Sequence, residues 1–172
     1  LLKRMSESVI NQFNYFKVHT QFSICEGTIK IDDLKNFCKD KKLRCAGLSD
    51  SFNLSGALEF SENLAKSGTQ PIIGTQILFN YKGEVGLLPL IAKSETGYKK
   101  IIELSSKSYL QSNNPTKPEC NLDDLMKDSD GLILFSGSIN CLIGSLFNKG
   151  KFLEIEEFYK LAKNIYSDRF YI

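Results

Sequence analysis

The chain has one histidine, His19, and the residues that follow it are of the types from which nucleophilic sites are built. Thr20, Ser23 and Cys25 come directly after it in the sequence. A Ser-His-Asp or Cys-His site needs a base that a third group holds against the nucleophile, and nothing in the local spacing arranges one. The sequence therefore favours a hydrogen-bonded histidine over a catalytic one. A metal cage rich in imidazole is disfavoured because there is no second histidine.

Other chemical signatures are absent. The sequence has no GxGxxG, GxxxxGK[ST], HExxH or GxSxG motif, which excludes the common nucleotide-binding loops and hydrolase signatures. The cysteines show no CxxC spacing and are odd in number, so we interpret them as reduced thiols in or near a core. They are Cys25, Cys38, Cys45, Cys120 and Cys141.

Polar residues gather where apolar segments end. The predicted strand ends carry His19 and Thr20, residues 49–51, Thr75 and Gln76, and residues 136–138. In α/β proteins functional groups collect at the carboxyl ends of strands. This set is mostly neutral, so it could hydrogen-bond a ligand but offers few groups for a divalent cation. We expect Asp50 to accept backbone N–H bonds rather than act as a base.

Short apolar strands alternate with amphipathic helices. This order predicts βαβ units and a mainly parallel sheet, and therefore an α/β fold. Strands are predicted at 13–22, 45–50, 71–79, 85–92, 131–135 and 170–172, and helices from 31 to about 42 and at 54–66, 96–110, 121–126, 139–147 and 153–166, with a loop at 111–120. The chain stops directly after its last strand, which is typical of a fragment.

Composition narrows the class of protein. The 172 residues include 22 Lys and Arg against 20 Asp and Glu, a net charge of +2 that disfavours a strongly basic nucleic-acid module. Hydrophobic residues make up 42%, which excludes a disordered chain, and no apolar run is long enough for a membrane span. The N-terminus lacks a secretory signal, so we expect a cytoplasmic protein without membrane partners, in which residues 1–12 are an N-terminal extension.

Six blocks of the sequence are familiar when taken together: 18–27 (VHTQFSICEG), 47–60 (GLSDSFNLSGALEF), 70–76 (QPIIGTQ), 90–98 (LIAKSETGY), 131–137 (GLILFSG) and 167–172 (SDRFYI). In order and spacing they resemble the N-terminal PHP (polymerase and histidinol phosphatase) domains of bacterial replicative polymerases, the DNA polymerase III alpha subunits. The resemblance implies that residues 13–172 are a PHP domain truncated at its C-terminal end. The implied fold is an incomplete, distorted (β/α)7 barrel with mainly parallel strands.

The resemblance also places a metal site that has lost most of its ligands. In metal-binding members of the family, histidines, carboxylates and a cysteine at strand ends hold the metals. The positions that align with ligands here are Lys17, His19, Glu26, Ser51, Gln76, Leu87 and Ser138. Only His19 and Glu26 keep a ligand type, and Lys17 would bring a positive charge into the site. We therefore expect no metal and no catalytic residue in this segment, and we expect the Lys17 ammonium to pair with Glu26.

Three hypotheses for function follow. The resemblance implies a scaffold that supports a replicative polymerase and docks its proofreading exonuclease subunit, with DNA, the replisome and Mg²⁺ engaged by the rest of the alpha chain. The second hypothesis is a divergent metal-dependent phosphoesterase or 3'-5' exonuclease that uses His19, Glu26 and Asp50. The third is a small-molecule-binding α/β protein unrelated to replication.

Overall fold

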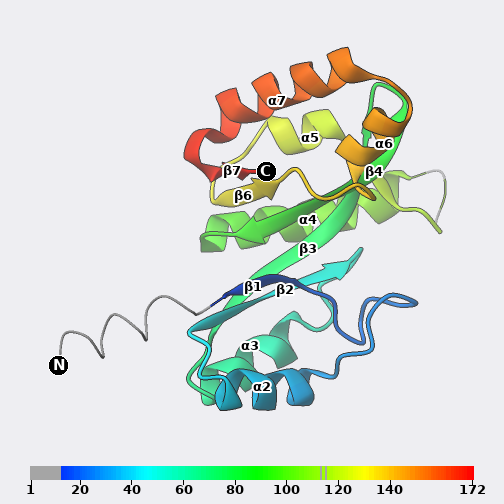
Figure 1. The fold of residues 1–172 in the computed structure, drawn as a ribbon. Helices are drawn as coiled ribbons and strands as arrows, with labels where there is room; N and C mark the ends of the chain where they lie inside the picture. Colours follow the sequence, from blue (N-terminus) through cyan, green and yellow to red (C-terminus); the bar gives the residue numbers. More distant parts are fainter. Residues whose placement is uncertain (1–12, 113, 115) are drawn as a thin grey trace, which may run out of the picture.

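A computed structural model describes residues 13–112, 114 and 116–172. The predicted extension 1–12 lies outside the described residues. Figure 1 shows the elements, which in chain order are β1 (Tyr15–Val18), α2 (Ile31–Asp40), β2 (Cys45–Ser51), α3 (Ala57–Lys66), β3 (Gln70–Tyr81), β4 (Glu84–Ala92), α4 (Glu95–Gln111), β5 (Glu119–Asn121), α5 (Leu122–Met126), β6 (Leu132–Phe135), α6 (Leu142–Asn148), α7 (Phe152–Tyr166), a 3-10 turn (Ser167–Arg169) and β7 (Phe170–Tyr171).

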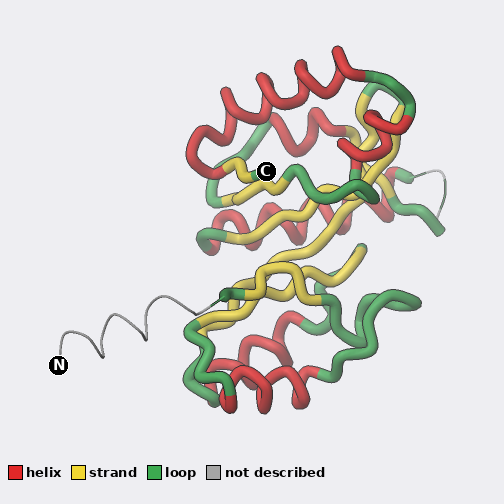
Figure 2. The backbone as a smooth tube through the Cα atoms, viewed as in Figure 1, coloured by secondary structure: helices red, strands yellow, loops and turns green. Residues whose placement is uncertain are grey.

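The described strands form one seven-stranded sheet in the order β1-β2-β3-β4-β6-β7, with β5 paired to the far end of β3. Four pairings are parallel, whereas β4 runs antiparallel to both β3 and β6. The α/β class is confirmed, and the sheet is a mixed one that curls into part of a barrel. Figure 2 shows the strands passing from the β1-β2 pair, through the long β3-β4 hairpin, to β6 and β7.

The helices cover the sheet from its convex side in two groups. The helices α2 and α3 pack on β1 and β2 through an apolar stripe that includes Ile31, Leu34 and Cys38 at helical spacing. The second core joins α4, α5, α6 and α7 to β3, β4 and β6, and Phe79 and Phe158 are fully buried in it. Since side chains alternate along a strand, the residues between these core positions face the other, concave side.

Several boundaries differ from the sequence-based expectation. Helix α4 begins at Glu95, because the Ser94 side chain rather than Thr96 accepts the hydrogen bond from the Gly97 backbone N–H. Part of the expected loop at 111–120 joins the sheet as β5, a pairing of only three residues with no apolar alternation to signal it. No helix in the described residues is long and apolar enough to cross a membrane.

Candidate functional site at the ends of the first three strands

The loop that follows β1 folds back over the strand ends. Ser23 N donates to Thr20 O at 2.9 Å, and the backbone N–H groups of Glu26 and Gly27 both donate to Ser23 O. The turn is tight at Gly27, where a Cβ atom would lie 2.1 Å from Thr20 O. Because only glycine fits there, the chain can return Glu26 to a position beside His19.

Asp50, near the end of β2, anchors this loop. Its fully buried carboxylate accepts hydrogen bonds from Thr20 N at 2.6 Å, Thr20 Oγ1 at 2.7 Å and Ser23 Oγ at 2.6 Å. Buried carboxylates are stable when their oxygens are satisfied in this way. Asp50 therefore accepts a backbone N–H as expected, and both of its oxygens are already engaged. The sequence pointed to Thr20 and Ser23 only as neighbours of His19, and no local pattern revealed them as partners of Asp50.

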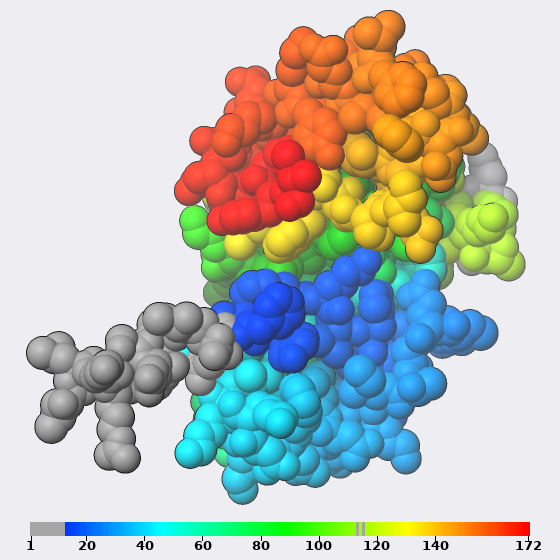
Figure 3. Space-filling view, in the orientation of Figure 1, coloured from blue at the N-terminus to red at the C-terminus, as the bar shows by residue number. Residues whose placement is uncertain are grey.

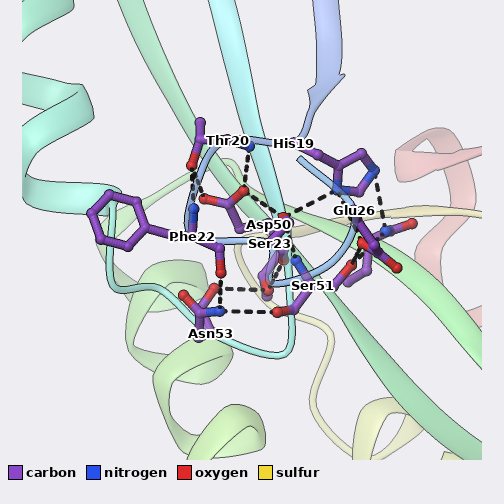
Figure 4. Close-up of polar contacts among 10 residues, drawn as sticks. His19, Thr20, Phe22, Ser23, Glu26, Asp50, Ser51 and Asn53 are labelled. Atoms are coloured by element: carbon purple, nitrogen blue, oxygen red, sulfur yellow. Dashed lines mark hydrogen bonds and ion pairs between the residues drawn. The ribbon is translucent and has the colours of Figure 1, made fainter. Parts of the chain in front are cut away.

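Four of the predicted site residues meet in one hydrogen-bonded cluster beside this anchor (Figure 4). His19 Nδ1 lies 3.4 Å from Ser23 Oγ and 3.7 Å from Glu26 Oε2, and its Nε2 lies 3.3 Å from Gln76 Nε2. Ser51 Oγ donates to Glu26 Oε2 at 2.5 Å and accepts from Gln76 Nε2 at 3.1 Å. Parallel pairing explains part of this meeting, because Ser51 and Gln76 are register partners on β2 and β3.

The hydrogen bonds favour one arrangement of the protons in the cluster. Ser51 has one hydroxyl proton, and the short contact with Glu26 uses it, so Ser51 can only accept from Gln76. The amide nitrogen of Gln76 also faces His19 Nε2, which accepts this hydrogen bond when the imidazole proton is on Nδ1. The Gln76 amide oxygen is buried and has no hydrogen-bond partner among the described residues. This arrangement favours a neutral His19 imidazole whose proton is on Nδ1, which lies near Ser23 and Glu26.

The electrostatic surroundings also favour neutral His19. Burial lowers the pKa of His19 from its usual value of 6.5, and the nearby Lys17 charge lowers it further, although Glu26 and Asp50 oppose both effects. Protonation at Nε2 would also place an N–H against the Gln76 amide group. Both effects act against an imidazolium at this place.

The other three predicted positions lie apart from the cluster. Lys17 is exposed on β1 and forms no ion pair with a carboxylate among the described residues, so the expected Lys17–Glu26 pair is wrong. The physical reason is that the Gly27 turn directs Glu26 toward His19 and Ser51. Leu87 is half-buried on β4 opposite Leu78. Ser138 follows β6, with its Oγ 3.8 Å from Cys141 Sγ.

In the part of the chain that the structure describes, no three His, Cys, Asp or Glu side chains come close enough together to form a metal site. The cluster contains one imidazole and one partly exposed carboxylate, and its other members are neutral hydroxyl and amide groups. This arrangement can form hydrogen bonds that connect the loop after β1 to strands β2 and β3.

Loss of the Asp50 carboxylate should destabilise the fold. The substitution Asp50→Ala leaves the buried Thr20 and Ser23 donors without an acceptor, and we expect a cost of about 3 kcal/mol. Urea unfolding followed by circular dichroism measures it. The matched control Asp40→Ala changes an exposed carboxylate at the end of α2 and should cost less than about 0.5 kcal/mol. Equal unfolding midpoints for the two variants would contradict the anchoring role.

The lowered pKa of His19 predicts a pH dependence of stability. The unfolded chain binds this proton at a higher pH than the folded chain, so the His19 contribution is complete above about pH 6.5 and is lost as the pH falls through the folded-state pKa. Because the chain has one histidine, its imidazole Cε1–H signal can be followed alone by proton NMR. We expect a titration midpoint below the usual 6.5.

A variant and a control test whether the Glu26 charge raises the pKa of His19. Glu26→Gln removes a charge that raises the His19 pKa, so it should lower the midpoint further. The control Glu62→Gln, an exposed residue on α3, should leave it unchanged. A native midpoint at or above the usual value would show that the imidazole is not held neutral.

Comparisons with known proteins agree on the family. The model of the PHP domain family matches residues 16–172. The DNA polymerase III subunit alpha of Caulobacter vibrioides is 34% identical over 176 residues, which cover 98% of this chain and 15% of that protein. The same subunit of Borreliella burgdorferi is 31% identical over 173 residues, covering 94% and 15%. This chain thus spans about 15% of the length of these curated relatives.

Two solved structures match parts of this chain. One described as a metal-dependent phosphoesterase from Bifidobacterium adolescentis has a TM-score of 0.46 at 17% identity, covering 58% of this chain and 34% of its own. An amidohydrolase from Chromobacterium violaceum has a TM-score of 0.43 at 9% identity. The match covers 86% of this chain and 54% of the amidohydrolase chain. The family match extends over nearly the whole described chain. The chain therefore belongs to the PHP domain family, and it is similar in sequence to the N-terminal region of DNA polymerase III alpha subunits.

Proposed function

We propose that this chain is the PHP segment of a replicative DNA polymerase alpha subunit, and that it acts as a structural and exonuclease-docking module without metal-dependent phosphoesterase activity. The observation that carries the proposal is the network of hydrogen bonds around His19 and Glu26, the two residues that keep a ligand type. A metal could bind there only by breaking these bonds.

The donors present do not fit the metal cluster of metal-binding PHP domains. The lone pair of His19 Nε2 faces the Gln76 amide, and Glu26 Oε2 accepts from Ser51. Ser51 and Gln76 are neutral, so they cannot balance the charge of two or three divalent ions. Asp50 cannot supply the missing charge without releasing Thr20 and Ser23. We therefore assign no step of catalysis to a metal in this segment.

The second candidate is a divergent phosphoesterase or 3'-5' exonuclease with a reduced metal site. The proximity of His19 Nδ1 to Glu26 Oε2, at 3.7 Å, is the observation in its favour. Its third ligand would have to be Asp50, whose two oxygens already accept hydrogen bonds from Thr20 and Ser23. We therefore rank the scaffold first, and the experiment on metal and nuclease activity distinguishes the two.

The proposal assigns nucleotide addition to other parts of a longer protein. The curated relatives are polymerase subunits of which this chain matches about 15%. Template-directed synthesis needs carboxylates that hold Mg²⁺, and the cluster described above offers one free carboxylate at most. The Mg²⁺ requirement, the contact with DNA and membership of the replisome belong to the whole alpha chain in this proposal.

Metal analysis combined with a nuclease assay tests the proposal. Protein dialysed against Mn²⁺ or Zn²⁺ should retain far less than one ion per chain, and it should not shorten single-stranded DNA in the presence of Mn²⁺. The matched variant Lys17→His/Ser51→His/Gln76→Glu restores ligand types at three positions and should retain more metal than the native protein. One bound ion per native chain together with DNA cleavage would establish the enzyme instead.

Docking is tested by binding. The proofreading exonuclease subunit of the same organism should co-elute with this chain in size-exclusion chromatography at micromolar concentration, and an unrelated exonuclease should not. Elution of the two proteins as separate species would remove the docking role and leave only the structural one.

A further inference from the structure

Basic side chains gather at the amino ends of β2 and β3, at the opposite end of β2 from the His19 cluster. The whole chain has a net charge of only +2, but the segment 39–44, which leads from α2 into β2, has four cations and one anion. We call it the basic segment. It lies beside the turn that leads into β3, because Gln70 N donates to Arg44 O at 2.9 Å. Both turns are at the lower left of Figure 1. Positive charge is therefore concentrated at one edge of the sheet.

Three cations of the basic segment are open to an anionic partner. Lys39, Lys41 and Arg44 are exposed, and their charged groups form no ion pair among the residues that the structure describes. A cation in the last turn of a helix stabilises that helix, which accounts for Lys39 in α2. The same reason does not apply to Arg44, because it lies beyond the helix, directly before β2. The structure therefore leaves part of this charge without a purpose inside the fold.

Three exposed aromatic rings, which we call the aromatic row, lie in line on β1 and α2. Phe13 is 70% exposed, and Tyr15 and Phe37 are 40% exposed each. The Tyr15 ring lies 4.9 Å from the Phe13 ring and 5.9 Å from the Phe37 ring, measured between centroids. The protein therefore covers these rings only in part.

The aromatic row and the basic segment form one continuous surface. Tyr15 pairs with β2 two positions beyond Arg44, so Phe13 lies level with Arg44 at the start of the two strands. On α2, Phe37 and Lys41 are four residues apart, so they share one side of the helix end. In Figure 3 the dark blue surface at the start of the described chain borders the cyan surface of the segment that leads into β2. Each end of the row thus has a cation beside it.

The row flanks a groove between β1 and α2. The groove has a volume of about 370 Å³, and Tyr15 and Phe37 form part of its walls. The other walls are mostly apolar side chains such as Leu34, and Asp33 also lines it. Such a groove accepts a flat ring but offers little hydrogen bonding that could distinguish one base from another.

We propose that this surface binds single-stranded DNA, with phosphate groups against the basic segment and bases stacked on the aromatic row. A cationic surface combined with aromatic rings is the common way in which proteins bind single strands. An acidic peptide would use the cations but not the rings, and duplex DNA keeps its bases paired and stacked away from them. A deoxyribose strand suits the apolar groove better than RNA, because the 2′-hydroxyl groups of RNA need polar partners.

This site goes beyond the proposed function and does not depend on it. It shares no residue with the His19 cluster, and it lies at the other end of β2. A metal-free scaffold could bind DNA here or not, so the two proposals can fail separately.

Fluorescence anisotropy with a labelled strand of about 15 thymidines tests the site. We expect saturable binding with a Kd between about 1 and 100 µM at low salt. An abasic strand of the same length carries the same charge without bases, so it should bind about tenfold more weakly. Tighter binding of a duplex, of oligouridine or of polyglutamate than of the thymidine strand would assign the surface to another partner and overturn the proposal.

Neutral variants test the phosphate contacts. Lys39→Gln/Lys41→Gln/Arg44→Gln should weaken binding at least about tenfold. It should also reduce the slope of log Kd against log salt concentration by about 2, because each phosphate contact on a single strand contributes about 0.7. The matched control removes three exposed cations elsewhere, in the variant Lys93→Gln/Lys117→Gln/Lys127→Gln. The control should change Kd less than about twofold. An equal loss in both variants would show that binding follows net charge alone, which contradicts the proposal.

Ring variants test the stacking. Tyr15→Leu and Phe37→Leu keep an apolar side chain without the ring, and each should weaken binding of the thymidine strand about fivefold to tenfold. Neither should change binding of the abasic strand. The control Phe152→Leu, at an exposed phenylalanine in α7, should leave both strands unaffected. Ring variants that bind like the native protein, equal affinities for the thymidine and abasic strands, or the absence of saturable binding would each overturn the proposal.

Discussion

The site depends on one buried carboxylate, that of Asp50, and on the three hydrogen bonds that join it to the loop after β1. A charge in the protein interior is tolerated only when its oxygens are satisfied, so the loop must place Thr20 and Ser23 against β2. Once Ser23 is held there, His19 lies beside it and Gly27 returns Glu26 to the same side. The positions of the residues that carry ligand types therefore follow from an interaction that involves neither of them.

Hydrogen bonds between mostly neutral side chains hold the cluster together. Metal-binding members of the family, as the resemblance describes them, hold ions with several imidazoles and carboxylates. The resemblance aligns Ser51 and Gln76 of this chain with two of those positions. In the structure the two side chains connect His19 to Glu26 through hydrogen bonds. Such a network keeps the strand ends together without the repulsion that unpaired anions would create. The neutral state of His19 follows from the same network and from burial.

The sequence predicted the positions of site residues that the pairing of neighbouring strands determines. It did not predict the contacts that depend on the path of a loop. Ser51 and Gln76 could be placed together because buried parallel strands end at one edge, and pairing of β2 with β3 brings them into register. The antiparallel direction of β4 follows from the short turn at Lys82 and Gly83, whereas the three-residue strand β5 leaves no periodic signal. The partner of Glu26 could not be derived, because it depends on the path of the loop through Gly27. The expected pair with Lys17 was wrong for that reason.

The central claim is that hydrogen bonds, rather than metal ions, occupy the ends of β1, β2 and β3. Anomalous diffraction at the manganese absorption edge, from crystals of this protein grown with excess Mn²⁺, tests it most directly. We expect no anomalous peak within bonding distance of His19 Nε2 or the Glu26 carboxylate, and we expect the Gln76 amide to remain against the imidazole. A peak bonded to both residues, with the Gln76 amide displaced from His19, would contradict it.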